Sequence, residues 1–181
     1  MITTTSRWYY ILYPMRTYII AASYGDASSA MAADWVMPVS LNPPLLAVAI
    51  SPKRYTHGII MKSREFTVNT MDYKYYSETF CVGNISGKDY PDKITRCGLS
   101  VLKARKIQAP VIREATGVVE CKLEASYPAG DHNIIVGRVI EAYMLKDMSL
   151  PPSPKDYKAL LHAGRALFTT TIDELVEAEE K

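Results

Sequence analysis

The sequence predicts a mainly β protein, built as a closed or half-closed antiparallel barrel with short helical insertions. Three observations support this class. Short apolar runs bounded by Gly, Pro or Asp recur through the first half of the 181-residue chain. Apolar and polar residues alternate with a period of two from Thr116 onward. Segments with helical spacing are short and irregularly placed, which argues against a regularly alternating α/β fold.

The first half contains four predicted strands. Residues 17–23 form a β-branched apolar run, a turn follows at 24–26, and residues 27–36 are again extended, so the pair predicts a hairpin. The apolar run at 45–50 lies between Pro-Pro and Ser-Pro and is too short for a typical helix, which predicts a buried strand. Residues 66–70 alternate and predict another strand.

Three short helices are expected between these strands. Residues 56–62 fit a helix opened by a threonine cap. Residues 72–82 carry aromatic side chains at helical spacing, with Asp72 as a plausible cap. Residues 92–97 fit a further helix that ends at a glycine.

The second half returns to strands. Residues 118–125 separate into one apolar and one mostly charged parity, which predicts a strand with one face in water. A turn at 128–131 precedes a long strand at 133–143, and Gly137 inside it suggests a bulge or a barrel bend.

The C-terminal segment predicts mixed structure. Ser153 can cap a short helix that runs through residue 162, and Gly164 can end it. Residues 168–171 could form a last strand, and residues 173–181 form an acidic, amphipathic helical pattern.

Composition excludes several classes. The length predicts one domain covering residues 1–181. A hydrophobic share of 48% with 22% charged residues excludes wholesale disorder. The net charge of +2 argues against an extended nucleic-acid-binding face. We therefore expect no nucleic-acid partner, and because no run approaches the roughly 20 apolar residues of a membrane helix, no membrane partner either.

The three cysteines and the N-terminus predict a cytoplasmic protein. Cys81, Cys97 and Cys121 are odd in number and widely spaced, which favours three buried or half-buried thiols over a disulfide framework or a zinc site. The N-terminal residues do not resemble a signal peptide. The 13 tyrosines, against 3 phenylalanines, suggest a large and partly polar contact surface.

Residues 27–35 form an unusual strand because six of the nine are Ala or Ser. Small side chains are poor core formers, but they let a flat ligand lie against the backbone, where N–H and C=O groups bind its polar edge. Trp35 could wall one end of such a site. The alternative is a strand packed tightly under a helix.

Residues 51–57 place two cations directly before a predicted helix. The N-terminus of a helix already carries partial positive charge, so cations are misplaced there unless an anion binds. Lys53 and Arg54, with the hydroxyls of Ser51 and Thr56, describe a phosphate site. The alternative is that both basic side chains simply point to water.

The predicted turn at 130–132 places His132 at the start of a long strand. A lone histidine is more often a structural hydrogen-bonding residue than a catalytic one, and its neighbours do not decide between these roles. The sequence has no nucleotide-binding glycine loop, no HExxH pair and no GxSxG elbow, so a hydrolase lacks support and no metal site is expected.

Taken together and in order, these segments resemble the flavin reductase-like family, the FMN-binding split barrels of the flavoredoxin and NAD(P)H:flavin oxidoreductase type. The resemblance covers about residues 10 to 170. It rests on MAADWVMPVS at 31–40, NPPL at 42–45, SPKRYTH at 51–57, FTVN at 66–69, PVIREA at 110–115, Glu120-Cys121, GDHNIIVG at 130–137 and LHAGR at 161–165.

The resemblance implies a Greek-key split β-barrel that forms a homodimer, with one FMN per subunit at or near the interface. His132 would be the catalytic residue near the nicotinamide. Asp34 stands where many relatives have Ser. The residues that the resemblance assigns to FMN are Ser29, Met31, Ala32, Ala33, Asp34, Trp35, Ser51, Lys53, Arg54, Thr56, His57, His162 and Arg165.

The implied function is an FMN-binding oxidoreductase, in which NAD(P)H passes a hydride to flavin N5 and an acceptor then takes the electrons. The acceptor could be free flavin, ferric iron or a partner protein. One alternative is an FMN-containing electron carrier without NAD(P)H activity of its own. Another is a related split barrel that acts on pyridoxine phosphate or binds haem. The tyrosines become candidates for the dimer surface or the rim of the flavin cleft.

Overall fold

A seven-stranded antiparallel sheet is the centre of the computed structural model, which describes residues 6–174. The strand order is β3-β2-β6-β9-β10-β5-β4. The strands are β2 (Tyr18–Tyr24), β3 (Ala27–Ala33), β4 (Val36–Ser40), β5 (Leu45–Ile50), β6 (Glu65–Thr70), β9 (Gly117–Ala129) and β10 (His132–Met144).

The sheet curls into a half-closed barrel. β3 and β4 are its two edges, yet only Asp34 and Trp35 separate them in the chain. The Ala49 N–H in β5 also donates to the Trp35 carbonyl at 3.0 Å, which holds the two edges near each other. The predicted class is therefore confirmed. The extended stretch predicted at 27–36 is instead two strands, because the chain turns at Asp34 to cross between edges.

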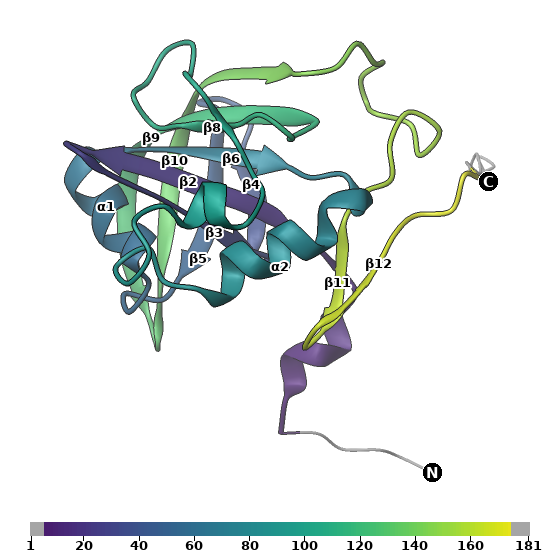
Figure 1. Cartoon of the computed structure of the whole chain (residues 1–181), viewed down its shortest axis with the longest axis horizontal. Coiled ribbons are helices and arrows are strands. Elements are labelled where there is room, and N and C mark those ends of the chain that lie inside the picture. Colours follow the sequence, from purple (N-terminus) through teal and green to yellow (C-terminus); the bar gives the residue numbers. More distant parts are fainter. Residues whose placement is uncertain (1–5, 175–181) are drawn as a thin grey trace.

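Two smaller sheets and four helical elements surround this barrel (Figure 1). One sheet joins β1 (Met15–Arg16), β11 (Leu161–Gly164) and β12 (Leu167–Thr169), and the other joins β7 (Val101–Leu102) and β8 (Val111–Ile112). The helical elements are η1 (Trp8–Leu12), α1 (Tyr55–Ser63), η2 (Tyr73–Tyr75) continued by α2 (Tyr76–Asn84), and α3 (Lys93–Arg96). Figure 1 shows β11 and β12 extending away from the barrel, with η1 near their tip.

Two helix N-caps were predicted, Asp72 and Thr56, and one of them is confirmed. The Asp72 carboxylate accepts the Lys74 backbone N–H, which confirms its role as a cap. The threonine cap on the first helix is wrong, because Arg54 occupies the N-cap position of α1 without a side-chain bond. The Thr56 hydroxyl instead donates to Ser29 Oγ at 3.1 Å, tying α1 to β3.

The helix predicted through residue 162 is wrong. His162 lies in β11, opposite Met15 of β1, so pairing with a distant strand overrides the local helical pattern. The last predicted strand is confirmed as β12. The helix predicted at 173–181 lies almost entirely outside the described residues.

The burial of Glu120 differs from the prediction for its strand. Glu120 of β9 was expected on a wet face, but it is fully buried. Its carboxylate accepts the backbone N–H groups of Arg105 and Lys106, at 2.6 and 2.8 Å, and the Tyr143 hydroxyl at 2.8 Å. The bulge expected at Gly137 is confirmed by a register shift between β9 and β10.

The cysteines differ from the expectation of three free thiols. Cys81 of α2 and Cys97, directly after α3, form a disulfide. Cys121 is free and buried in the barrel, and burial raises the pKa of its thiol to about 12. The disulfide removes the cysteine pattern as an argument for a cytoplasmic location. Over residues 6–174, no helix is both long and apolar enough to cross a membrane.

Candidate functional site

Three adjoining cavities follow β3 along the open side of the barrel, with volumes of about 100, 220 and 230 Å³. Arg54 lines all three. Met31 and Ala32 each line two, and Gly83 and Asn84 at the end of α2 also line two. The shared walls make the cavities parts of one continuous cleft.

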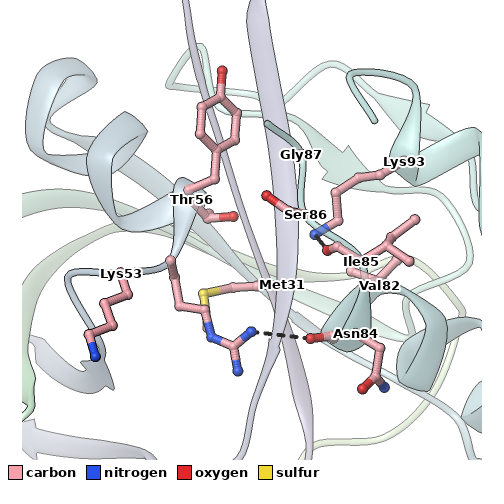
Figure 2. A pocket seen from close by; sticks show the side chains of 12 residues that line it. Met31, Lys53, Thr56, Val82, Asn84, Ile85, Ser86, Gly87 and Lys93 are labelled. Atoms are coloured by element: carbon pink, nitrogen blue, oxygen red, sulfur yellow. Dashed lines mark hydrogen bonds between the residues drawn. The ribbon is translucent and has the colours of Figure 1, made fainter. Parts of the chain in front are cut away.

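The smallest cavity is cationic. Lys53 and Arg54 line it from the segment before α1, and Lys93 lines it from α3. Figure 2 shows Lys53 and Lys93 on opposite sides of this cavity. Lys93 is only 3% exposed, and its ammonium donates to the Ile85 carbonyl at 2.8 Å. Burial, and then the nearby Arg54 guanidinium, lower the pKa of Lys93 to about 8. Across residues 6–174, no salt bridge joins any of these three cations to a carboxylate.

The backbone around this cavity is closely packed. A Cβ on Gly87 would lie 2.5 Å from Ser29 Oγ and 2.9 Å from the Tyr55 ring. A Cβ on Gly83 would lie 3.1 Å from Ala32 Cβ. Glycine at both positions therefore lets the wall after α2 approach β3 and α1. Three cations beside the N-terminus of the nine-residue α1 suit a phosphate group.

The second cavity has a floor of small side chains. Ala32 and Ala33 of β3 line it with Met31, and Trp35 and His132 stand at one side with ring centroids 5.0 Å apart. Because β3 is an edge of the sheet, no strand in the described part of the chain pairs with the backbone groups on its outer side. A flat aromatic ligand with a polar edge fits such a floor.

The third cavity contains a hydrogen-bonded network centred on Asp34. The Asp34 carboxylate accepts the Thr17 hydroxyl at 2.8 Å and the Tyr13 hydroxyl at 3.1 Å, and His162 Nδ1 lies 2.7 Å away. His162 Nε2 lies 2.8 Å from the Arg165 carbonyl. Burial and the neighbouring Asp34 raise the pKa of Tyr13 above its usual range. Asp34 is thus engaged by protein groups on both of its oxygens.

The structure brings together all but two of the residues that the sequence assigned to this site. Ser29 lies behind the cleft, fully buried beneath Thr56. His57 lines none of the three cavities, and its Nε2 lies 3.2 Å from Asn133 Nδ2. Burial lowers the pKa of His57. The residues that line the cleft are Met31, Ala32, Ala33, Asp34, Trp35, Ser51, Lys53, Arg54, Thr56, His132, His162 and Arg165.

Sequence reasoning missed one whole wall of the cleft. The residues of this wall that it missed are Phe80, Val82, Gly83, Asn84, Ile85, Ser86, Gly87, Lys93 and Phe168, whereas Tyr13 was among the tyrosines expected at the rim. The available signal was the run Gly83-Asn84-Ile85-Ser86-Gly87, in which two glycines bracket a turn directly after a helix. Only the tertiary contact between α2 and β3 places this run opposite Arg54.

Comparison with known proteins agrees with this geometry. Residues 10–171 match the model of the flavin reductase like domain. The chain is 35% identical to an uncharacterized protein of Pyrococcus abyssi over 94% of this chain and 98% of that one. It is 30% identical to the reductase component of 4-hydroxyphenylacetate 3-monooxygenase of Thermus thermophilus, over 68% of this chain and 72% of that one.

Solved structures extend the similarity to the whole fold. Flavoredoxin from Methanosarcina acetivorans superposes with a TM-score of 0.86 at 25% identity, covering 98% of this chain and 95% of that one. An FMN-binding protein from Thermus thermophilus with bound 1-cyclohex-2-enone also gives a TM-score of 0.86, at 24% identity and 98% coverage of both chains.

Proposed function

Because the chain belongs to the flavin reductase-like family, we propose that it is an FMN-binding oxidoreductase that passes electrons from NAD(P)H to an acceptor. The observation that carries this proposal is the junction of a small cationic cavity with a floor of small side chains on an edge strand. The two parts match the two ends of FMN, a phosphate and a flat ring. Bound FMN would supply the redox chemistry itself.

The phosphate end of FMN is assigned to three residues of the segment before α1 and its first turn. Lys53 and Arg54 supply charge, and Thr56 supplies a hydroxyl beside the N–H groups of the helix N-terminus. Ser51 lines the adjoining cavity and is assigned to the chain between the phosphate and the ring. The small side chains of β3 leave room for the ring against the backbone.

His132 is assigned to the electron donor. Its Nδ1 lies 2.7 Å from the Asp131 carboxylate, and its ring lies beside Trp35, so the imidazole is held in one orientation. Nε2 is then the nitrogen left for a ligand. The name of the Thermus thermophilus relative, a reductase component, supports a reductase role for this chain. Asp34 and His162, which bond each other, would shape the far wall of the cleft.

A homodimer is proposed through the apolar face around β4, which directly follows Trp35 of the cleft. Val36, Pro38 and Leu46 line an apolar cavity of about 330 Å³ beside β4. Met37 and Leu41 nearby are 59% and 92% exposed. A face this apolar on an edge strand favours burial against a second copy. Sedimentation equilibrium tests this assignment, and a monomer at micromolar concentration would contradict it.

The test of the redox function is anaerobic. The protein is loaded with FMN, freed of excess flavin, and mixed with NADH or NADPH while the flavin absorbance is followed. Bleaching with either donor, followed by reoxidation in a screen of free flavin and ferric iron, is expected. Failure to take up FMN would overturn the proposal. An FMN-loaded protein that stays oxidised with both donors would instead support the alternative, an electron carrier without NAD(P)H activity of its own.

A further inference from the structure

His57 is a buried residue of α1 to which the proposed function gives no role. The sequence assigned it to FMN, but its side chain lines none of the three cavities of the cleft. The residue is 8% exposed, and its Nε2 lies 3.2 Å from Asn133 Nδ2 in β10. An amide nitrogen can only donate, so His57 Nε2 accepts this hydrogen bond and the ring proton is on Nδ1. Burial lowers the pKa of His57, which favours this neutral ring.

Asn133 lies at the point where the hairpin of β9 and β10 extends beyond the rest of the sheet. β5 pairs with β10 from Arg138 to Asn133, and Ile50, the partner of Asn133, is the last residue of β5. The next residue toward the turn is His132, which among residues 6–174 pairs only with β9. A two-stranded ribbon is marginally stable by itself, so the position of its tip depends on the side chains that hold it.

The tip of this hairpin, residues 127–132, is mostly in water, because residues 127–131 are all exposed. The hydrogen bond to His132 and the nearby Lys53 ammonium both lower the pKa of Asp131 in the turn. The Asp131 side chain is 93% exposed, so water and salt screen its attraction to Lys53. A buried contact at the base of the tip is therefore the firmer anchor.

The amide group of Asn133 joins three elements at this base. Its Nδ2 lies 3.4 Å from Ser126 Oγ in β9 and 3.2 Å from His57 Nε2 in α1. Thr56, directly before His57, lines the small cationic cavity. The contact thus links the helix whose N-terminus is assigned to the phosphate with the hairpin that carries His132.

Resting on the proposed function, we propose that His57 is a positioning residue that accepts a hydrogen bond from Asn133 and thereby holds His132 beside the floor of the second cavity. His132 is assigned to the electron donor, and a displacement of about 1 Å at such a group can lower a rate by roughly 100-fold. The position requires an acceptor, because a second donor would face the Asn133 amide nitrogen.

The first experiment measures hydrogen exchange by mass spectrometry on the full chain without flavin. His57→Leu removes the acceptor, and exchange in peptides covering residues 127–133 should accelerate by roughly 5- to 30-fold. Asn133→Ala removes the donor and should give the same acceleration, and the double variant should give no more than either alone. Val118→Ala, in a buried position at the opposite end of the same hairpin, is the matched control and should leave the tip unchanged.

The second experiment separates positioning from cofactor binding. FMN-loaded His57→Leu should be reduced by NADH or NADPH with a limiting rate roughly 5- to 50-fold below that of the wild type. Its FMN dissociation constant should stay within about threefold. His57→Gln places an amide oxygen near the position of Nε2 and should restore most of the limiting rate. If His57→Leu does not fold, Asn133→Ala tests the same contact from its other partner.

Two results would overturn the proposal. One is a tip whose exchange stays at the wild-type rate in His57→Leu and Asn133→Ala. The other is a His57→Leu protein that loses FMN affinity but, once loaded, is reduced at the wild-type rate, which would return His57 to the cofactor. If wild-type protein takes up no FMN, the proposed function fails, and the exchange data still decide whether His57 holds the tip.

Discussion

His162 Nδ1 lies 2.7 Å from Asp34 Oδ2, although 128 residues separate the two in the chain. The contact joins β11, in the small outlying sheet, to the point where the main sheet passes from β3 to β4. It also fills one side of the cleft with a hydrogen-bonded pair of side chains. Both side chains are largely buried, at 14% exposed for Asp34 and 19% for His162.

Replacing Asp34 should destabilise the protein. Asp34→Ala leaves the hydroxyls of Tyr13 and Thr17 and the His162 ring without their shared acceptor. We expect the free energy of unfolding to fall by about 2–4 kcal/mol, measured by urea denaturation. Asp26→Ala in an exposed turn is the control and should change it by less than about 0.5 kcal/mol. Equal effects of the two variants would show that the network contributes little.

Removing the Arg54 guanidinium should weaken FMN binding. Arg54 lines all three cavities, and within residues 6–174 its guanidinium makes one long hydrogen bond, 3.4 Å to the Gly83 carbonyl. A charge-assisted bond to phosphate contributes about 1–3 kcal/mol, so Arg54→Ala should raise the FMN dissociation constant by roughly 5- to 150-fold. Flavin fluorescence titration checks this, with Lys62→Ala as the control. An unchanged constant would remove Arg54 from the site.

His132 should affect turnover more than cofactor affinity. His132→Ala removes the imidazole assigned to the donor but leaves the cationic cavity intact. The rate of flavin reduction at fixed NADH or NADPH should fall by roughly tenfold or more, while the FMN dissociation constant stays within about twofold. Asp131→Asn, which only weakens the orienting bond, should cause a smaller fall. The reverse pattern would assign His132 to holding the cofactor.

The disulfide should stabilise both the fold and the cleft. The chain between Cys81 and Cys97 contains most of the wall opposite Arg54, including residues 82–87 and Lys93. Closing a loop of this length stabilises by about 3 kcal/mol. The Cys81→Ser, Cys97→Ser double variant should therefore unfold at lower urea and bind FMN more weakly. Adding a dithiol should reproduce both effects in the wild type and neither in the double variant, and a wild type that does not respond would contradict the prediction.

Cys121 should resist thiol reagents. Burial raises its pKa to about 12, so the thiol stays protonated through pH 9 and the reactive thiolate is scarce. Without a reductant, native protein at pH 8 should react slowly with Ellman's reagent. One thiol should appear when the protein is unfolded, because Cys81 and Cys97 are paired. Rapid reaction of the native protein would indicate that the barrel opens readily near β9.

Some elements could be predicted from the residues that they themselves contain. The strand Leu45–Ile50 is an unbroken apolar run between prolines, and the structure has it with the same bounds. The bulge at Gly137 was also predicted, because a glycine inside a strand suggests a bulge. The structure adds that a Cβ there would lie 2.5 Å from the Phe66 ring. In both cases the physical requirement is expressed by the residue itself.

At Glu120 and His162, contacts with residues distant in the chain outweigh the local sequence pattern. Glu120 fits a wet face by alternation, yet buried backbone donors and Tyr143 compensate its charge. His162 follows a helical pattern, yet strand pairing and Asp34 hold it in β11. These partners lie at least 14 residues away along the chain, so no window of local sequence contains them.

The sequence by itself determined the mainly β class and the two halves of the candidate site, the small-residue strand and the cations before α1. Tertiary structure decided what faces them. It closed the cleft with the turn after α2, buried Lys93 opposite Lys53, and linked Cys81 to Cys97. The reason is that residue type reports the chemistry a side chain can offer, whereas burial and counterions depend on which distant segments the fold brings alongside it.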